Sequence, residues 1–454
     1  MSDEEIPLKF SSLTPAFLVF ISLVSAVSAQ TTVLKDVTLI DGTGKTPRHH
    51  VSLILEGDKI RTISEQKKAL PSDANVIDLS GKTIMPEIIN CHGHLGLLKG
   101  TQTLSANYTR DNLARQLLQY QDYGVGAVQV MGTDHEEAYA WRDESRAGTL
   151  PGAAFYTAGR GFGVPAGMPP LAMGMDQVYR PETPEEARRD VDDLAKHHPD
   201  MVKMWVDDFY GQYPKMKPEI YAAIIDQAHK YHLRVAAHLF HLTDAQGLVD
   251  AGIDVFAHSV RDAQIPASLL TEMKRKHITY IATLSLDEFA TAYAGDPQWL
   301  NDPFFRNALE PGVYEMITSE KYKQSQQTSK SAAAEKIALP IALKNVKAVF
   351  DAGISVALGT DSGATPVRPY GYAEHAELEL LVQAGLTPLQ AITVATSNGA
   401  TFLHAASEFG TLKPGLKANF IILDKDPSQD IHNSRSILSV WHNGKEVSHG
   451  PHAH

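Results

Sequence analysis

Residues 83–94 have the sequence TIMPEIINCHGH, and this stretch decides the fold because an apolar strand pattern runs directly into two histidines. In a β-strand, side chains two positions apart point to the same face. We therefore expect His92 and His94 to project together, while Cys91 and Gly93 face the opposite way. Two imidazoles at the end of a strand form half of a metal site. The spacing alone fits two solvated surface histidines equally well, so further ligands have to decide between the two interpretations.

Length and charge limit the classes of protein that this chain can belong to. With 454 residues it exceeds one ordinary domain, and a large barrel plus a smaller module would account for it. The net charge of -12 argues against a nucleic-acid partner and provides no basic face for anionic lipid. The single cysteine, Cys91, excludes an intrachain disulfide and a CxxC-type zinc site. We expect a small-molecule substrate, and a homo-oligomer is left open.

Residues 1–29 have the features of a signal peptide. The apolar run AFLVFISLV at 16–24 is followed by the small residues SAVSA, which would leave Gln30 as the new N-terminus. The run is too short for a comfortable membrane span. Acidic residues dominate the segment before it, which is atypical and leaves a misassigned start or an uncleaved anchor as alternatives. We predict a periplasmic or secreted protein that is not held at a membrane after cleavage.

The two chain ends share the pattern of a small β module. Residues 30–85 and 408–454 contain short alternating strands separated by turn sequences, including an Asn443-Gly444 hairpin signal. We predict one small β-sandwich built from both ends. Between them, residues 86–407 alternate strand and helix patterns, which is typical of a parallel sheet covered by helices.

Eight such strands predict an α/β fold, a (β/α)8 TIM barrel flanked by the sandwich. The predicted strands are 83–94, 127–132, 153–159, 201–206, 233–238, 254–259, 278–284 and 354–362. The predicted helices are 111–123, 136–146, 184–197, 218–230, 243–251, 267–276 and 341–352.

In a barrel of this kind, the active site lies at the carboxyl ends of the strands. Six metal-competent residues fall there: His92, His94, Lys203, His238, His258 and Asp361. Each alone has an ordinary explanation, such as a packed histidine, a turn-forming aspartate or a snorkelling lysine. Their common position on successive strands favours a metal centre instead. A bare ammonium at Lys203 inside the barrel would be costly, and carbamylation would convert it into an anionic bridging ligand.

Several motifs resemble those of the metal-dependent amidohydrolase superfamily, within its imidazolonepropionase-like and prolidase-like branch. They are TIMPEIINCHGH, VKMWVDD, VAAH, FAHSV, ALGTDSG and GTLKPGLKANFIILDKDP. The resemblance implies a binuclear centre, with His92, His94 and Asp361 on one metal, His238 and His258 on the other, and carboxylated Lys203 between them. Two zinc ions are expected from the imidazole and carboxylate ligands, and manganese, iron or cobalt are left open.

These parts predict an exported enzyme that hydrolyses an amide bond, with a dipeptide or an N-acyl amino acid as the expected substrate. Metal-activated hydroxide would attack the carbonyl, and Asp361 would shuttle the proton to the leaving nitrogen. A cyclic amide or imidazolone, an ester or a lactone would fit the same site. A non-catalytic secreted binding protein is a further alternative, although it would need a damaged site.

Substrate selection is expected from the loops that follow the strands. The candidates are Arg160, His241 and Arg261, because a cation near the metals suits a substrate carboxylate. An ion pair between Arg261 and its neighbour Asp262 is the alternative. The long insertion 285–340 is expected to form a lid or a substrate wall, and the alternative role for its aromatic residues is to pack the insertion. The family pattern differs at Glu87 and Asn90, where glycine and aspartate are frequent.

Overall fold

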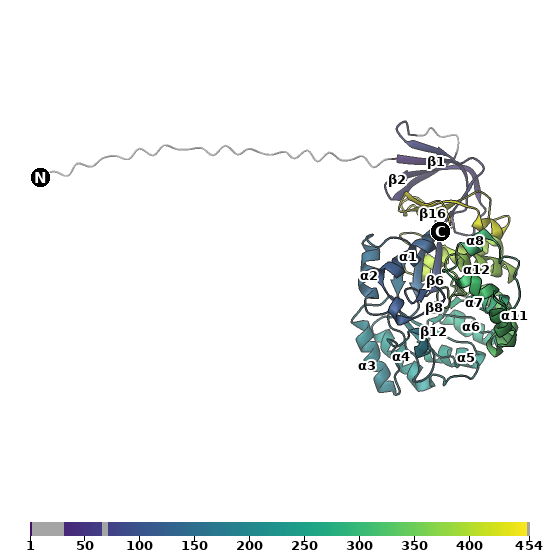
Figure 1. The fold of residues 1–454 in the computed structure, drawn as a ribbon. Coiled ribbons are helices and arrows are strands. Elements are labelled where there is room, and N and C mark those ends of the chain that lie inside the picture. The colour runs from purple at the N-terminus through teal and green to yellow at the C-terminus, as the bar shows by residue number, and fades with distance from the viewer. Residues whose placement is uncertain (2–30, 66–70, 452–454) are drawn as a thin grey trace.

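The computed structural model describes Met1, residues 31–65 and residues 71–451 (Figure 1). The predicted signal peptide falls, from residue 2 onward, outside the described residues. Within them, no helix combines the length and the apolar composition needed to cross a membrane. The described chain is an α/β protein in which a mixed sheet adjoins parallel strands covered by helices.

Both chain ends contribute to one eight-stranded sheet, with the order β18-β17-β16-β5-β1-β2-β3 and β4 paired to β1. Only the β1–β4 and β1–β5 pairs are parallel. The strands are β1 (Thr31–Leu39), β2 (Arg48–Glu56), β3 (Lys59–Glu65), β4 (Asn75–Asp78), β5 (Thr83–Pro86), β16 (Phe420–Leu423), β17 (Ile437–His442) and β18 (Lys445–Ser448). Figure 1 shows this sheet at one end of the molecule. The predicted union of the two ends is therefore observed, and the sandwich arrangement stays a prediction.

The hairpin between β17 and β18 has the predicted Asn-Gly turn. Asn443 and Gly444 have φ angles of 49° and 73°, as a type I′ turn requires. A Cβ atom on Gly444 would lie 2.2 Å from the carbonyl oxygen of Gly57, so only glycine fits this close approach to the β2–β3 turn.

Eight parallel strands form two sheets, β10-β9-β6 and β11-β12-β13-β14-β15. Backbone hydrogen bonds join these sheets at two places, from Cys91 N to Leu358 O and from Phe162 N to Lys203 O, each 2.8 Å long. The strands are β6 (Ile88–Gly93), β9 (Val125–Val130), β10 (Ala154–Thr157), β11 (Val202–Trp205), β12 (Val235–His238), β13 (Val255–Phe256), β14 (Thr279–Ile281) and β15 (Ser355–Ala357).

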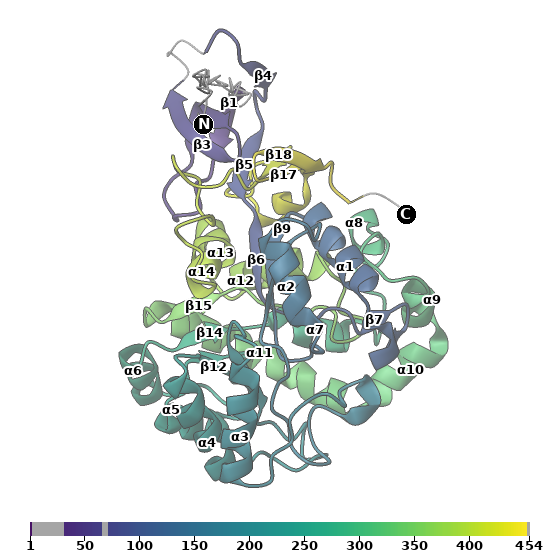
Figure 2. The same ribbon diagram turned by 90° about the vertical axis from the view of Figure 1, so that its left-hand side faces the viewer.

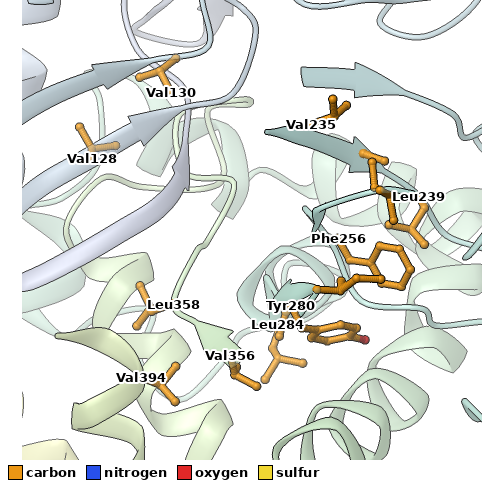
Figure 3. Packing of buried hydrophobic residues seen from close by; sticks show 14 of the residues in the cluster. Val128, Val130, Val235, Leu239, Phe256, Tyr280, Leu284, Val356, Leu358 and Val394 are labelled. Carbon is orange, nitrogen blue, oxygen red and sulfur yellow. The ribbon is translucent and has the colours of Figure 1, made fainter. Parts of the chain in front are cut away.

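The parallel strands are buried on both faces. Phe256, Tyr280 and Val356 pack into one apolar cluster that includes the helices, as Figure 3 shows. Their neighbours Val255, Ile281 and Ala357 belong to a second cluster on the opposite faces of the same strands. Burial on both faces is typical of parallel strands and explains their continuous apolar sequences.

Helices cover the outer faces of these strands, and Figure 2 shows α3 to α6 side by side. The apolar positions Ile220, Ala223, Ile224 and Ala228 of α4 recur at helical spacing and are buried, which gives the helix one core-facing stripe. The covering helices are α1 (Arg110–Asp122), α2 (Ala138–Arg146), α3 (Pro184–Ala195), α4 (Pro218–Lys230), α5 (Leu242–Ala251), α6 (Ala267–Arg275), α11 (Lys330–Asp351), α12 (Tyr372–Gln383), α13 (Pro388–Ala395) and α14 (Ser397–Phe402). Shorter elements are β7 (Leu98–Lys99), β8 (Gln102–Thr103), η1 (Ser105–Asn107), η2 (Leu171–Met173) and η3 (Ile431–Arg435).

Helix α11 corrects one prediction. Its expected start at residue 341 was wrong, because the helix begins at Lys330 and contains Pro340. Ser329 caps it instead, since its side-chain oxygen accepts a hydrogen bond from Ala332 N. A proline inside a helix removes one backbone hydrogen bond, which makes it a natural but here misleading boundary signal.

The insertion that follows β14 is helical rather than a loop. It consists of α7 (Leu284–Ala292), α8 (Pro303–Arg306), α9 (Val313–Thr318), α10 (Glu320–Thr328) and the first turns of α11. Its buried aromatic residues Phe289, Tyr293 and Phe305 share a cluster with Tyr372 of α12. Packing of the insertion therefore accounts for these aromatic side chains.

Candidate metal centre

Two histidines and an aspartate converge where β6 ends. His92 is the penultimate residue of β6, and His94 follows that strand directly. Asp361 lies beyond β15 in a left-handed conformation, with φ 58°, which aspartate tolerates better than most residues. Asp361 N donates to His92 O at 2.8 Å, and His94 N donates to Ser362 O at 2.9 Å. These backbone bonds hold the aspartate beside both histidines.

The ligand atoms of the three side chains form a compact group. Asp361 Oδ1 lies 3.2 Å from His92 Nε2 and 2.8 Å from His94 Nε2. One ligand atom from each residue lies within 4.8 Å of the others, and all three residues are buried. Nitrogen and carboxylate oxygen at this spacing suit a divalent cation such as zinc.

The Nδ1 atoms of three histidines are anchored by the strands around them. His92 Nδ1 donates to Ala257 O at 2.7 Å, so its Nε2 carries the lone pair. His94 Nδ1 lies 2.8 Å from Thr133 Oγ1, and His258 Nδ1 lies 2.8 Å from Thr283 Oγ1. The Nε2 atoms of His92 and His258 are buried without a hydrogen-bond partner among the described residues. Anchoring of one ring nitrogen while the other stays open is the arrangement of metal-ligating histidines.

The other sequence-predicted ligands lie next to this group. The His92 and His258 ring centroids are 4.6 Å apart, and those of His258 and His238 are 4.2 Å apart. His258 lies beyond β13, because that strand ends at Phe256 rather than at the predicted residue 259. His238 ends β12, and its Nε2 is 3.3 Å from Asp207 Oδ2.

Lys203 is fully buried in β11, and its Nζ has no hydrogen-bond partner among the described residues. The Nζ lies 4.7 Å from the ring centroid of Trp205. Burial lowers the pKa of Lys203 to about 7, although Asp361 opposes that shift. An unpartnered buried amine costs free energy as an ammonium, which fits a lysine whose working form is not a free ammonium.

The electrostatics of the group favour ligand forms that can bind a cation. Burial, together with the charge of Lys203, lowers the pKa of His92 to about 3, so its imidazole is neutral. Burial raises the pKa of Asp361, but Arg368 and the adjacent imidazoles of His92 and His94 outweigh it and hold that pKa well below its usual range. Neutral imidazoles and an ionised carboxylate are the species that coordinate metals.

Sequence reasoning missed two charged residues that contact the group. Arg368, in the loop between β15 and α12, places Nη1 on Asp361 Oδ2. Asp207 pairs with His238, and it also belongs to a second cation-competent group with Asp208 and His241. Asp207 and Asp208 are part of the quoted VKMWVDD motif, and Arg368 follows the ALGTDSG motif, so proximity to these motifs was the available signal.

The three predicted substrate contacts are each engaged within the protein. Arg261 Nη1 lies 3.1 Å from Asp287 Oδ1 of α7, so Asp262 is not its partner. Instead, Asp262 lies 3.0 Å from His241 Nδ1. Arg160 donates to Gln177 O at 2.8 Å and stacks over Tyr179, 4.0 Å from the ring centroid.

Glu87, where the family pattern often has glycine, is buried at the junction of the two-ended sheet and β6. Its Oε2 lies 2.8 Å from His442 Nδ1 of β17. Gly126 of β9 leaves room for this carboxylate, since a Cβ there would lie 2.1 Å from Glu87 Oε2. The departure from the pattern therefore creates a buried ion pair between the chain's end and its parallel strands.

Comparison with known proteins supports this interpretation of the site. The model of the amidohydrolase family matches residues 83–447. A 5-methylthioadenosine/S-adenosylhomocysteine deaminase from Halalkalibacterium halodurans is 22% identical over 415 residues, which cover 87% of this chain and 85% of that protein.

Solved structures share the fold. A putative prolidase from Bifidobacterium longum matches with a TM-score of 0.75 and 22% identity, covering 94% of this chain and 97% of that chain. A Xaa-Pro dipeptidase with bound methionine matches with a TM-score of 0.73 and 20% identity, covering 92% and 100%. These likenesses indicate a TIM-barrel-like α/β fold. The family match spans most of the chain, and the protein therefore belongs to the amidohydrolase family, whose metal-dependent members hydrolyse carbon–nitrogen bonds.

Proposed function

We propose that this protein is a binuclear metal-dependent amidohydrolase that cleaves the amide bond of a dipeptide or an N-acyl amino acid. The observation that carries the proposal is the buried Lys203 amine, which has no hydrogen-bond partner among the described residues and shares its site with the open Nε2 atoms of His92 and His258. We further propose that Lys203 is carboxylated and bridges two cations, which His92, His94 and Asp361 hold on one side and His238 and His258 on the other. His238 would exchange its contact with Asp207 for a cation.

A closed (β/α)8 barrel is part of this proposal. Hydrogen bonds at both seams between the two parallel sheets, and the separate apolar cluster inside the strands, support closure. The shared core of Leu34, Leu53, Phe420 and Trp441 supports a sandwich formed by the two chain ends around residues 86–407.

Two divalent cations, with zinc as the expected metal, would activate a water molecule and polarise the scissile carbonyl when bound. The chain's own residues then perform the proton chemistry. Asp361, ionised and held by Arg368, accepts the proton of the attacking water and delivers it to the leaving nitrogen. The anchors Thr133, Thr283 and Ala257 keep the three imidazole rings oriented throughout.

The reaction of the site also fits other substrates. A cyclic amide, an imidazolone, an ester or a lactone passes through a comparable tetrahedral oxyanion. Because one relative is named as a deaminase of 5-methylthioadenosine and S-adenosylhomocysteine, the substrate panel includes aminopurine nucleosides. Export to the periplasm or the medium, a small-molecule substrate and the absence of a nucleic-acid or membrane partner complete the proposal, on the charge and N-terminal pattern of the sequence.

The test combines metal analysis with a substrate panel. We expect close to two metals per chain, and turnover of at least one dipeptide or N-acyl amino acid. Lys203→Ala should lose the second metal and most activity, whereas Lys196→Ala, at an exposed position of the α3 C-terminus, should keep both. Full activity of the Lys203→Ala variant would contradict the bridging role, and a wild-type protein that binds metal but turns over nothing would favour the binding-protein alternative.

A further inference from the structure

Arg368 has an unusual environment for a half-buried arginine. Its Nη1 donates to Asp361 Oδ2, and no other hydrogen bond of its side chain exists within the described part of the chain. Its Nε is buried without an acceptor, while 16% of the side chain stays exposed. A buried donor without a partner costs about 1–3 kcal/mol, so this group is expected to gain an acceptor in the working enzyme.

Arg261 also has a buried Nε without an acceptor among the described residues, but it differs from Arg368 in its access to solvent. Arg261 is 3% exposed and paired with Asp287, and its guanidinium lies over the Phe240 ring. Arg160 is occupied by Gln177 O, Tyr179 and Asp193. Of these three arginines, Arg368 combines an Nε that lacks an acceptor among the described residues with partial exposure and direct contact with the reacting carboxylate.

The surroundings of Arg368 place it between the centre and the insertion. Its charge acts on His94 and Asp361 on one side. On the other side it acts on Asp287 of α7 and Glu335 of α11, which already bind Arg261 and Tyr210. An anion held by Arg368 would thus lie between the predicted ligands and the insertion.

We propose that Arg368 is the residue that selects substrates with a free carboxylate next to the scissile amide. The inference rests on the proposed amide hydrolysis and assigns to one residue the preference for a dipeptide or an N-acyl amino acid over the cyclic amides, esters and lactones that would fit the same site. One guanidinium edge would hold Asp361 and the other would bind the substrate carboxylate through two parallel hydrogen bonds. In an N-acyl amino acid, a single carbon separates that carboxylate from the leaving nitrogen. By holding both the substrate carboxylate and Asp361, Arg368 would therefore place the leaving nitrogen beside Asp361, which delivers the proton to it.

A purely positioning role for Arg368 makes a different prediction. If it only held Asp361, its loss would slow all substrates equally. If it also anchors the substrate carboxylate, its loss slows the carboxylate substrate more than the corresponding carboxamide, because the carboxamide loses only the support of Asp361.

The experiment compares N-acetyl-L-alanine with N-acetyl-L-alanine amide, and L-alanyl-L-alanine with its C-terminal amide, on the metal-loaded full-length chain. We expect the wild type to prefer the free carboxylate. Arg368→Met should reduce kcat/KM for the carboxylate substrates by on the order of 10- to 100-fold, chiefly through KM, with a much smaller loss on the amides. Arg368→Lys should recover part of the preference, since lysine keeps the charge but cannot donate two parallel hydrogen bonds from one planar edge. Arg188→Met, an exposed arginine of α3, is the matched control.

Calorimetric binding of N-acetyl-L-alanine and its amide provides a readout without turnover. The wild type should bind the carboxylate more tightly, and Arg368→Met should bind both alike. Equal losses on carboxylates and amides would reduce Arg368 to a positioning residue, and an unchanged preference would overturn its role altogether. If the wild type hydrolyses none of the four compounds but binds the carboxylate form more tightly, and Arg368→Met binds both forms alike, the amidase proposal fails. The carboxylate-binding role of Arg368 would then still stand.

Discussion

Asn90 Nδ2 donates a hydrogen bond to Glu374 Oε1 across 2.7 Å, and Asn90 Oδ1 accepts from His92 N at 2.9 Å. Both side chains are fully buried. The amide thus serves as donor to one neighbour and acceptor to another, which an ionised aspartate cannot do. Since α12 supplies the carboxylate to this contact, an asparagine fits position 90 better than an ionised aspartate would.

Asn90→Asp should therefore destabilise the protein, because two carboxylates would face each other in a buried site. We expect a loss of roughly 3 kcal/mol or more in the free energy of unfolding. Urea unfolding of the metal-free protein measures it. The double variant Asn90→Asp with Glu374→Gln moves the donor to the other partner and should recover most of the loss. A double variant as unstable as Asn90→Asp alone would show that the pairing does not explain the asparagine.

Arg261 and Asp287 form the buried link between the strand ends and the insertion. Asp287→Ala removes a hydrogen bond to a buried charge and should cost about 2–3 kcal/mol of stability. Asp262→Ala, at the sequence neighbour that is not the partner, should cost less than about 1 kcal/mol. Thermal unfolding of both variants checks this, and equal losses would contradict the pairing.

The fold was predictable where local patterns and packing agree. The bounds of α4 coincide with their prediction, because Pro218 opens the helix and the apolar spacing continues to its end. The strands near His258 and Asp361 were predicted too long, since both residues lie in the loops after β13 and β15. Both loops begin with a buried apolar residue, Ala257 or Leu358, and hydrophobicity alone cannot separate the start of a buried loop from the end of a strand.

The sequence predicted which residues form the site, but it did not predict which side chains these residues contact. Motif spacing points to His92, His94 and Asp361, and the structure brings them together. Arg261 was expected to face a substrate or its neighbour Asp262, yet its partner Asp287 comes from the insertion. Such long-range pairs depend on how the insertion packs, which no local pattern encodes. Arg368 was missed for the same reason, because its loop closes on Asp361 only in three dimensions.

The contribution of the Glu87–His442 pair to the stability of the fold is expected to depend on pH. Burial lowers the pKa of His442, but the charge of Glu87 and its hydrogen bond outweigh that and raise it above the ordinary value. A histidine pKa that is raised in the folded state adds stability that is fully present at low pH and lost as pH rises through the folded pKa. Glu87→Gln should therefore destabilise the protein more at pH 5.5 than at pH 8.5.

Urea unfolding at the two pH values measures this difference. His50→Gln removes an exposed histidine–aspartate pair, in which the imidazole is 74% exposed, and serves as the control. The control should show little change at either pH, because exposed pairs contribute little. A Glu87→Gln effect that grows with pH would rule out a protonated His442.

The Lys203 amine is expected to lower the stability of the metal-free protein, although the proposed metal centre needs it. In the described part of the metal-free protein its amine is buried without a hydrogen-bond partner, and burial lowers its pKa to about 7, so the folded state gives up a proton that the unfolded chain keeps. A lysine pKa that is depressed in the folded state costs stability as pH falls from about 10 toward 7. Lys203→Met should therefore stabilise the metal-free protein by about 1–4 kcal/mol at pH 7 while removing the second metal and most activity. Urea unfolding in a chelator measures the gain, with Lys196→Met as the control. A metal-free Lys203→Met protein that is less stable than the wild type would show that burying the amine costs no free energy of folding. The physical reason for carboxylation of Lys203 would then be absent.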